Sequence, residues 1–199
     1  SGKTTITNLL LRFYDVQQGK ITLGGVDIRD IPYDELLDRI SIVMQNVQLF
    51  DNTIEENIKV GKKGATKEEI IEAAKKARIH DFIMSLPNAY ETDIGENGGI
   101  LSGGQRQSLS LLMATVKKPK ILLLDEHTAA LDPKTSKIIM DKTNDLIKKE
   151  KITTLMITHN LKNAIDYSDR IIMLNKGKVV LDILPSEVTE EELNRIYNE

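Results

Sequence analysis

The chain has 199 residues, a length typical of one or two domains. Its 27 lysine and arginine residues nearly balance 30 aspartate and glutamate residues, so the formal net charge is −3 and no strong field for nucleic acid is expected. The chain has no cysteine, which excludes a disulfide framework and a thiolate zinc site. Hydrophobic residues make up 40% and aromatic residues only 4%, a globular composition that argues against stacking on nucleic-acid bases.

The first half of the chain combines short strands with a helical region. Apolar residues at helical spacing follow the opening residues, and a compact apolar run at 40–44 predicts a buried strand. In chain order, the sequence predicts a helix after Lys3, a hairpin at 21–28, a strand at 40–44, helices at 53–58 and 70–77, and a loop at 88–99.

Beyond Ser102, strands and helices alternate. The predicted elements are a helix that ends before Pro119, then strand 120–124, helix 134–149, strand 153–157, helix 161–166, strands 170–174 and 178–183, and a last helix at 190–197. This alternation predicts an α/β fold with a mostly parallel sheet flanked by helices. We interpret residues 1–45 and 110–185 as two parts of one core, residues 46–109 as an inserted helical subdomain, and residues 186–199 as a C-terminal helix.

The opening tripeptide Gly2-Lys3-Thr4 matches the end of the phosphate-binding loop G-x-x-x-x-G-K-[ST]. Lys3 would reach the β- and γ-phosphates of a nucleotide, and the Thr4 hydroxyl would ligate Mg²⁺. Backbone N–H groups of the first helical turn, which includes Thr5, would face phosphate oxygens. Taken alone, the tripeptide also fits the first turn of an ordinary solvated helix.

Two adjacent carboxylates, Asp125 and Glu126, follow the aliphatic strand near 121–124. Ligands bind at the carboxyl edge of an open α/β sheet, and neighbouring strand residues point to opposite faces. Asp125 would therefore hold Mg²⁺, while Glu126 would orient or deprotonate an attacking water. The alternative is a pair of solvated acids that end a core strand.

The most specific string is Leu101-Ser102-Gly103-Gly104-Gln105-Arg106-Gln107. Ser102 followed three residues later by Gln105 predicts a capping box at the start of a helix. The two glycines would also let a phosphate approach the backbone closely.

Together these three motifs resemble the nucleotide-binding domain of ATP-binding cassette (ABC) proteins, with a P-loop NTPase-type fold, over residues 1 to about 183. The resemblance implies that Gln45 contacts Mg²⁺ and the attacking water and senses a membrane partner, and that His159 bonds the γ-phosphate. It also implies that the site is completed by a second subunit. The signature residues of one subunit meet the nucleotide held by the other subunit, and these residues are Ser102, Gly103, Gly104 and Gln105. By the same resemblance, Asp132 lies in a loop that crosses the interface between the two subunits. Without the family, Gln45 and His159 are ordinary residues at strand ends, and Asp132 before Pro133 is an ordinary helix cap.

Two departures from the family pattern bear on activity and direction. The chain begins inside the phosphate loop, so the preceding glycines, the adenine-stacking aromatic and the first antiparallel strands are missing from it, and we expect weak ATP binding and slow hydrolysis. Residues 46–107 resemble a drug or lipid exporter, whereas residues from Ser108 onward resemble an importer ATPase, which suggests a chain joined near the signature helix.

The function implied by the resemblance is an ATP-hydrolysing motor of a transporter, using ATP and Mg²⁺. The expected partners are a second nucleotide-binding domain in a head-to-tail dimer and a transmembrane subunit, which would place the chain peripherally at the cytoplasmic face of the cell membrane. Two alternatives remain: a fragment that keeps the fold without turnover, and a soluble ABC ATPase acting on ribosomes or DNA.

Overall fold

The structure is a computed structural model that describes residues 2–198. The chain divides into two compact units. The first unit combines the residues up to Leu37 with those from Met156 onward, and the second unit runs from Asp38 to Leu155.

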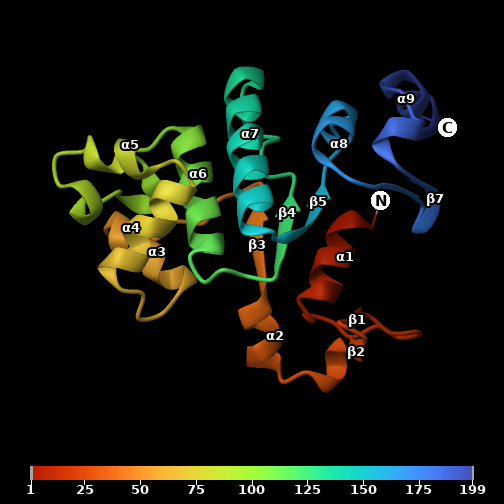
Figure 1. Cartoon of the computed structure of the whole chain (residues 1–199), viewed down its shortest axis with the longest axis horizontal. Coiled ribbons are helices and arrows are strands. Elements are labelled where there is room, and N and C mark those ends of the chain that lie inside the picture. Colours follow the sequence, from red (N-terminus) through yellow and green to blue (C-terminus); the bar gives the residue numbers. More distant parts are fainter. Residues whose placement is uncertain (1, 199) are drawn as a thin grey trace. The chain divides into compact units, whose positions relative to one another are not determined.

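The second unit contains the parallel sheet that the alternating pattern predicts. Strands β3 (Ile40–Met44) and β4 (Ile121–Asp125) pair in parallel, from Ile40 opposite Ile121 to Met44 opposite Asp125. Strand β5 (Thr153–Ile157), which begins in this unit, completes the order β3-β4-β5 (Figure 1). Residues 122–124 are almost completely buried, as expected for a strand covered on both faces. The predicted α/β class is confirmed.

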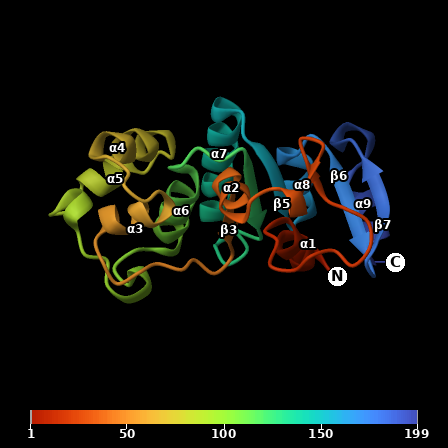
Figure 2. The ribbon, with the colours of Figure 1, turned by 90° about the horizontal axis from the view of Figure 1, so that it is seen from below.

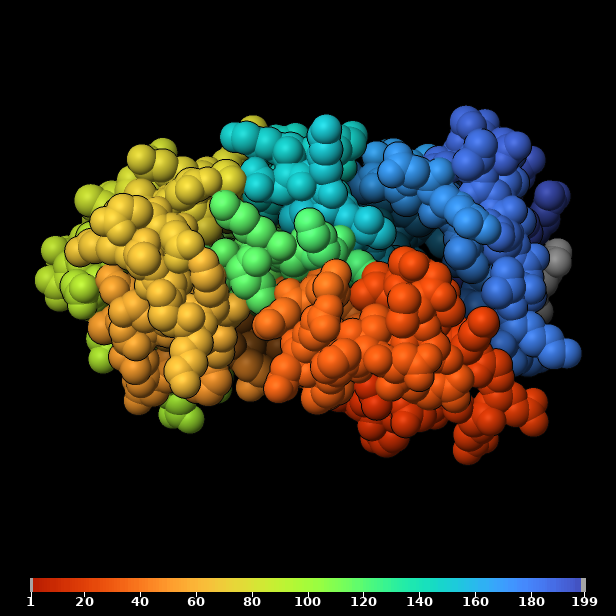
Figure 3. Space-filling view, turned by 60° about the horizontal axis from the view of Figure 1, so that its bottom comes forward, coloured from red at the N-terminus to blue at the C-terminus, as the bar shows by residue number. Residues whose placement is uncertain are grey.

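Helices of the second unit build a hydrophobic core of their own. They are α3 (Ile54–Gly61), α4 (Lys67–Lys76), α5 (His80–Met84) and α6 (Gly103–Thr115). Their fully buried side chains include Ile58, Ile70 and Leu112. Figure 3 shows the surface of this part of the chain in colours from orange-yellow to yellow-green. Helix α6 also contacts β3 and α7 (Pro133–Glu150). The boundaries 46–109 for a helical subdomain stay a prediction.

The first unit holds shorter elements (Figure 2). They are α1 (Lys3–Leu10), the hairpin β1 (Thr22–Leu23) and β2 (Val26–Asp27), α8 (Leu161–Tyr167), the antiparallel pair β6 (Ile171–Asn175) and β7 (Lys178–Ile183), and α9 (Glu190–Asn198). Among residues 2–198, no helix is both long and apolar enough to cross a bilayer.

Several elements differ from the sequence prediction. Helices α2 (Tyr33–Arg39) and α5 were not predicted, and the expected loop at 88–99 contains the 3₁₀ turns η2 (Ala89–Glu91) and η3 (Glu96–Gly98). Two further 3₁₀ turns are η1 (Ile28–Asp30) and η4 (Pro185–Glu187). Helix α6 ends at Thr115 because Lys118, which precedes a proline, takes a left-handed φ of 53°.

Candidate functional site

The predicted phosphate-binding residues lie at the start of α1, in the first unit. Gly2 precedes the helix with φ 83° and ψ 4°, a left-handed conformation that glycine adopts without strain. Lys3 is the first helical residue, and Thr4 and Thr5 are exposed. The first N–H groups of a helix have no partner within it, so this turn can donate to an anion.

Lys3 and His159 both lie next to α9 within the first unit. The Nζ atom of Lys3 is 5.8 Å from the centroid of the Tyr197 ring. His159 is exposed, follows β5, and lines a shallow pocket with the start of α8 and the start of α9. Asn160 caps α8 by accepting a hydrogen bond of 2.9 Å from the Asn163 N–H, which fixes the backbone beside His159.

In the second unit, β3 and β4 end at the same edge of the sheet. Because Met44 lies opposite Asp125, the next residues, Gln45 and Glu126, leave this edge side by side along the register. Asp125 and Glu126 are half-buried and Gln45 is exposed. The structure thus brings three of the predicted site residues to one carboxyl edge.

Glu126 has an unusual backbone conformation. Its φ is +48°, a left-handed value that costs free energy for any residue other than glycine. Its carbonyl oxygen accepts a hydrogen bond of 2.9 Å from the Ala129 N–H, which closes a tight turn directly after β4. The chain therefore turns at Glu126, the first residue after β4.

Residues 102–105, called the Ser102 turn below, form the predicted capping box at the start of α6. The Ser102 Oγ accepts a hydrogen bond of 3.3 Å from the Gln105 N–H, and the Gln105 Oε1 accepts one of 2.8 Å from the Ser102 N–H. These bonds satisfy two donors at the start of α6 and confirm the cap.

The two glycines of this turn allow a close approach between the starts of α6 and α7. A Cβ atom on Gly103 would lie 3.1 Å from the Leu131 Cδ2, and one on Gly104 would lie 2.7 Å from the Thr135 Cγ2. The structure therefore packs the Ser102 turn against the loop that holds Asp132.

Asp132 is the N-cap of α7. Its Oδ1 accepts hydrogen bonds of 3.1 Å and 3.0 Å from the N–H groups of Lys134 and Thr135. Hydrogen bonds from the side chain and backbone of Thr135 lower the pKa of Asp132, so the exposed cap stays ionised near neutral pH. The capping role is confirmed, and a role between subunits stays a prediction.

Gln107 had no predicted role, although it ends the signature string. Its buried side chain donates a hydrogen bond of 3.4 Å from Nε2 to the Met44 carbonyl oxygen. This contact joins α6 to the end of β3, one residue before Gln45. The available signal was that Gln107 shares a helix face with Leu111 and Ala114, four and seven residues later, which are also buried.

His127, next to Glu126, also had no predicted role. It is 3% exposed, and its Nε2 atom has no hydrogen-bond partner among the described residues. Burial lowers the pKa of His127 from 6.5 to about 4, because desolvation penalises the charged imidazolium. The folded protein therefore holds this side chain neutral.

We expect His127 to make stability depend on pH in the acid range. Between about pH 6.5 and pH 4 the unfolded chain binds a proton that the folded chain does not, so the free energy of unfolding falls as the pH falls. His127→Leu should reduce the loss of unfolding free energy between neutral pH and about pH 4 by about 2–3 kcal/mol. Urea unfolding at both pH values measures the difference. Equal losses in both proteins would contradict this expectation.

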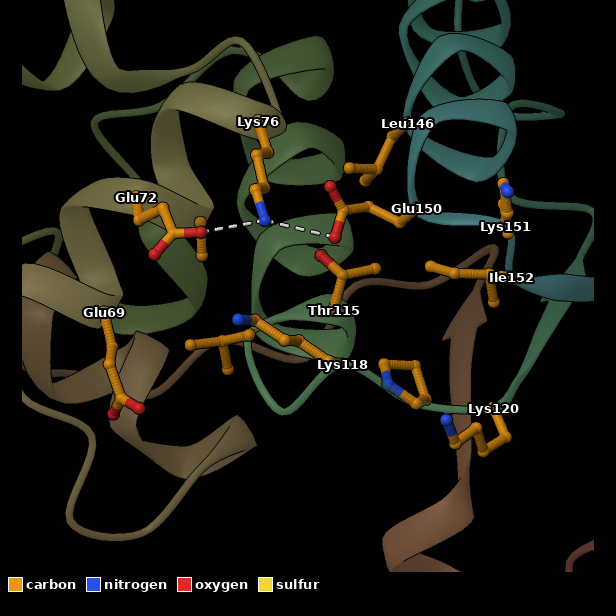
Figure 4. A pocket seen from close by; sticks show the side chains of 13 residues that line it. Glu69, Glu72, Lys76, Thr115, Lys118, Lys120, Leu146, Glu150, Lys151 and Ile152 are labelled. Atoms are coloured by element: carbon orange, nitrogen blue, oxygen red, sulfur yellow. Dashed lines mark hydrogen bonds and ion pairs between the residues drawn. The ribbon is translucent and has the colours of Figure 1, made fainter.

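A cavity of about 210 Å³ lies elsewhere in the second unit, and none of the predicted site residues lines it (Figure 4). The Nζ atom of Lys76 lies 2.9 Å from a Glu72 carboxylate oxygen and 3.1 Å from one of Glu150. The pair with Glu72 lies within α4, whereas the pair with Glu150 joins α4 to α7 at the cavity.

Comparisons with known proteins agree with the motifs. A family model described as ABC transporter matches residues 1–129. Multidrug resistance protein pgp-1 of Caenorhabditis elegans is 47% identical over 179 residues, which are 90% of this chain and 13% of that protein. The putative multidrug export ATP-binding/permease protein YgaD of Bacillus subtilis is 44% identical over 179 residues, 90% of this chain and 30% of that protein.

A solved structure, described as a bacterial Atm1-family ABC exporter with ATP bound, matches the whole chain with a TM-score of 0.84 and 36% identity. The chain covers 35% of that structure's chain, so it spans a minor part of each of these proteins. The importer resemblance of the second half stays a prediction. The motifs, the fold and the match over residues 1–129 together show that the chain belongs to the ABC transporter family.

Proposed function

We propose that the chain is the ATP-binding and ATP-hydrolysing motor domain of an ABC transporter. The observation that carries the proposal is the shared carboxyl edge of β3 and β4, where Gln45 and Glu126 follow paired strand ends and Asp125 lies beside them. Phosphoryl transfer to water needs positioning and charge neutralisation more than covalent chemistry, and such an edge supplies carboxylates for both tasks.

Glu126 accepts the proton of the attacking water or orients it, because its carboxylate stands at the edge while its backbone is locked in a tight turn. Thr4, Gln45 and Asp125 would hold Mg²⁺: their hydroxyl, amide and carboxylate oxygens are the hard donors that this ion prefers. The ion would neutralise phosphate charge when bound.

Lys3 and the N–H groups of residues 2–5 hold the phosphates, and His159 donates a hydrogen bond to the γ-phosphate. The support is the left-handed Gly2 followed by the open first turn of α1. A helix start favours anions through its unpaired N–H groups and its dipole.

A second copy or a related domain completes the site in a head-to-tail dimer. Ser102, Gly103, Gly104 and Gln105 of one copy face the γ-phosphate held by the other, and Asp132 lies at the interface. The close packing of the Ser102 turn on the Asp132 loop supports a single surface that carries both.

The membrane partner contacts the region of Gln45 and the helical subdomain, at the cytoplasmic face of the membrane. Two of the relatives are named as multidrug proteins and the matched structure as an exporter, which favours export. Closure of the dimer on ATP and its opening after hydrolysis would move the membrane helices.

Nucleotide binding tests the proposal through Lys3. Lys3→Ala should weaken binding of ATP with Mg²⁺ at least about tenfold, measured by isothermal titration calorimetry, because a charged hydrogen bond to phosphate is lost. Lys178→Ala, at an exposed lysine of the same unit, is the matched control and should leave the affinity unchanged. Equal affinity of both variants would overturn the proposed phosphate site.

A further inference from the structure

Helix α9 is firmly attached to the first unit. Its Leu193 side chain is fully buried against Ile171 and Met173 of β6. Ile196 adds a partly buried contact to the same cluster, which also includes residues of α8. The helix is amphipathic, so one face packs here and the other carries polar residues.

The C-terminal end of α9 engages Lys3. The Nζ atom of Lys3 lies 5.8 Å from the centroid of the Tyr197 ring, within the range of a cation–π interaction. The Lys3 ammonium therefore already has an aromatic partner at the start of α1.

The N-terminal end of α9 places acidic side chains beside His159. Glu190 and Glu191 line the shallow pocket that contains His159, and both are exposed. Glu192, by contrast, is occupied by the cap, since its Oε2 accepts hydrogen bonds of 2.8 Å and 2.9 Å from the N–H and Oγ1 of Thr189. Two acidic residues therefore line the same pocket as His159.

We propose that α9 is an autoinhibitory cover of the nucleotide site. Tyr197 competes with phosphate for the Lys3 ammonium, and the carboxylates of Glu190 and Glu191 repel phosphate from His159. ATP must displace both contacts, so the docked helix lowers nucleotide affinity. This inference rests on the proposed function, because it takes Lys3 and His159 as phosphate ligands.

Two variants of the full chain test the cover through ATP affinity, measured by calorimetry with Mg²⁺. Tyr197→Leu keeps an apolar side chain but removes the aromatic ring, and it should tighten binding about two- to fivefold. Tyr197→Phe keeps the ring face and should bind like the wild type. The double change Glu190→Gln with Glu191→Gln should also tighten binding, and more strongly at low salt because exposed charges are screened.

The contact itself has a separate readout that needs no nucleotide. The Lys3 side-chain methylene resonances should be shifted upfield by the Tyr197 ring, and Tyr197→Leu should remove the shift. Equal affinity of wild type, Tyr197→Leu and the double glutamine variant would overturn the cover. If the ring shift is present and ATP binds none of these proteins, the proposed function and the cover both fail, whereas binding that Lys3→Ala abolishes but Tyr197→Leu leaves unchanged rejects the cover alone.

Discussion

Glu126→Gln is expected to lower the rate of ATP hydrolysis at least about 100-fold, because a positioned general base contributes on the order of 10²–10⁴ to such reactions. The amide keeps the size of the side chain but accepts a proton from water far less readily. Glutamine also fits the left-handed backbone at this position no worse than glutamate, so the turn after β4 should persist. Phosphate release under saturating ATP measures the effect, and calorimetry should show that ATP binding is retained.

Glu91→Gln is the matched control, because Glu91 is an exposed glutamate in a 3₁₀ turn far along the chain from the strand edge. It should leave the rate unchanged. A wild-type chain without measurable hydrolysis would favour a folded scaffold without turnover, for which the engagement of Lys3 by Tyr197 is the supporting observation. Equal rates for wild type and Glu126→Gln would reject Glu126 as the base.

Much of the fold could be predicted, because the spacing of apolar residues and the capping residues of helices are local features of the sequence. Strands at 153–157 and 178–183 have the predicted bounds, and Thr53 and Ser102 cap helices as expected. Helices α2 and α5 were missed. Each has two turns or less, and the one buried residue within each is Leu36 in α2 and Ile83 in α5, so tertiary packing stabilises them more than a local pattern does.

The sequence proposes candidate site residues, but it does not show which side chains they contact. The signature string identifies the turn at residues 102–105, yet only the structure shows that a Cβ atom on Gly104 would crowd the Thr135 side chain. The left-handed backbone of Glu126 and the burial of His127 depend on how the chain turns after β4. The contact between Lys3 and Tyr197 joins residues at opposite ends of the sequence, and no local pattern indicates it.

Gly61→Ala is expected to destabilise the second unit by about 3 kcal/mol, near the upper end for overpacking. Gly61 ends α3 where this helix meets α6, and a Cβ atom there would lie 1.9 Å from the Met113 carbonyl oxygen and 3.0 Å from the Val116 Cγ1. The obstacle is backbone inside a long helix, which cannot rotate aside as a side chain can, so α3 must move and open the core around Ile58.

Urea unfolding measures this loss, and Gly99→Ala provides the matched control. A Cβ atom on Gly99 would meet only the Glu96 carbonyl oxygen, at an ordinary 3.5 Å, so this change should stay within about 0.5 kcal/mol of the wild type. Because α6 begins at the Ser102 turn, displacing its last turns also disturbs the helix that carries the signature. Equal stability of the two alanine variants would mean that α3 and α6 are not packed as closely as Gly61 requires.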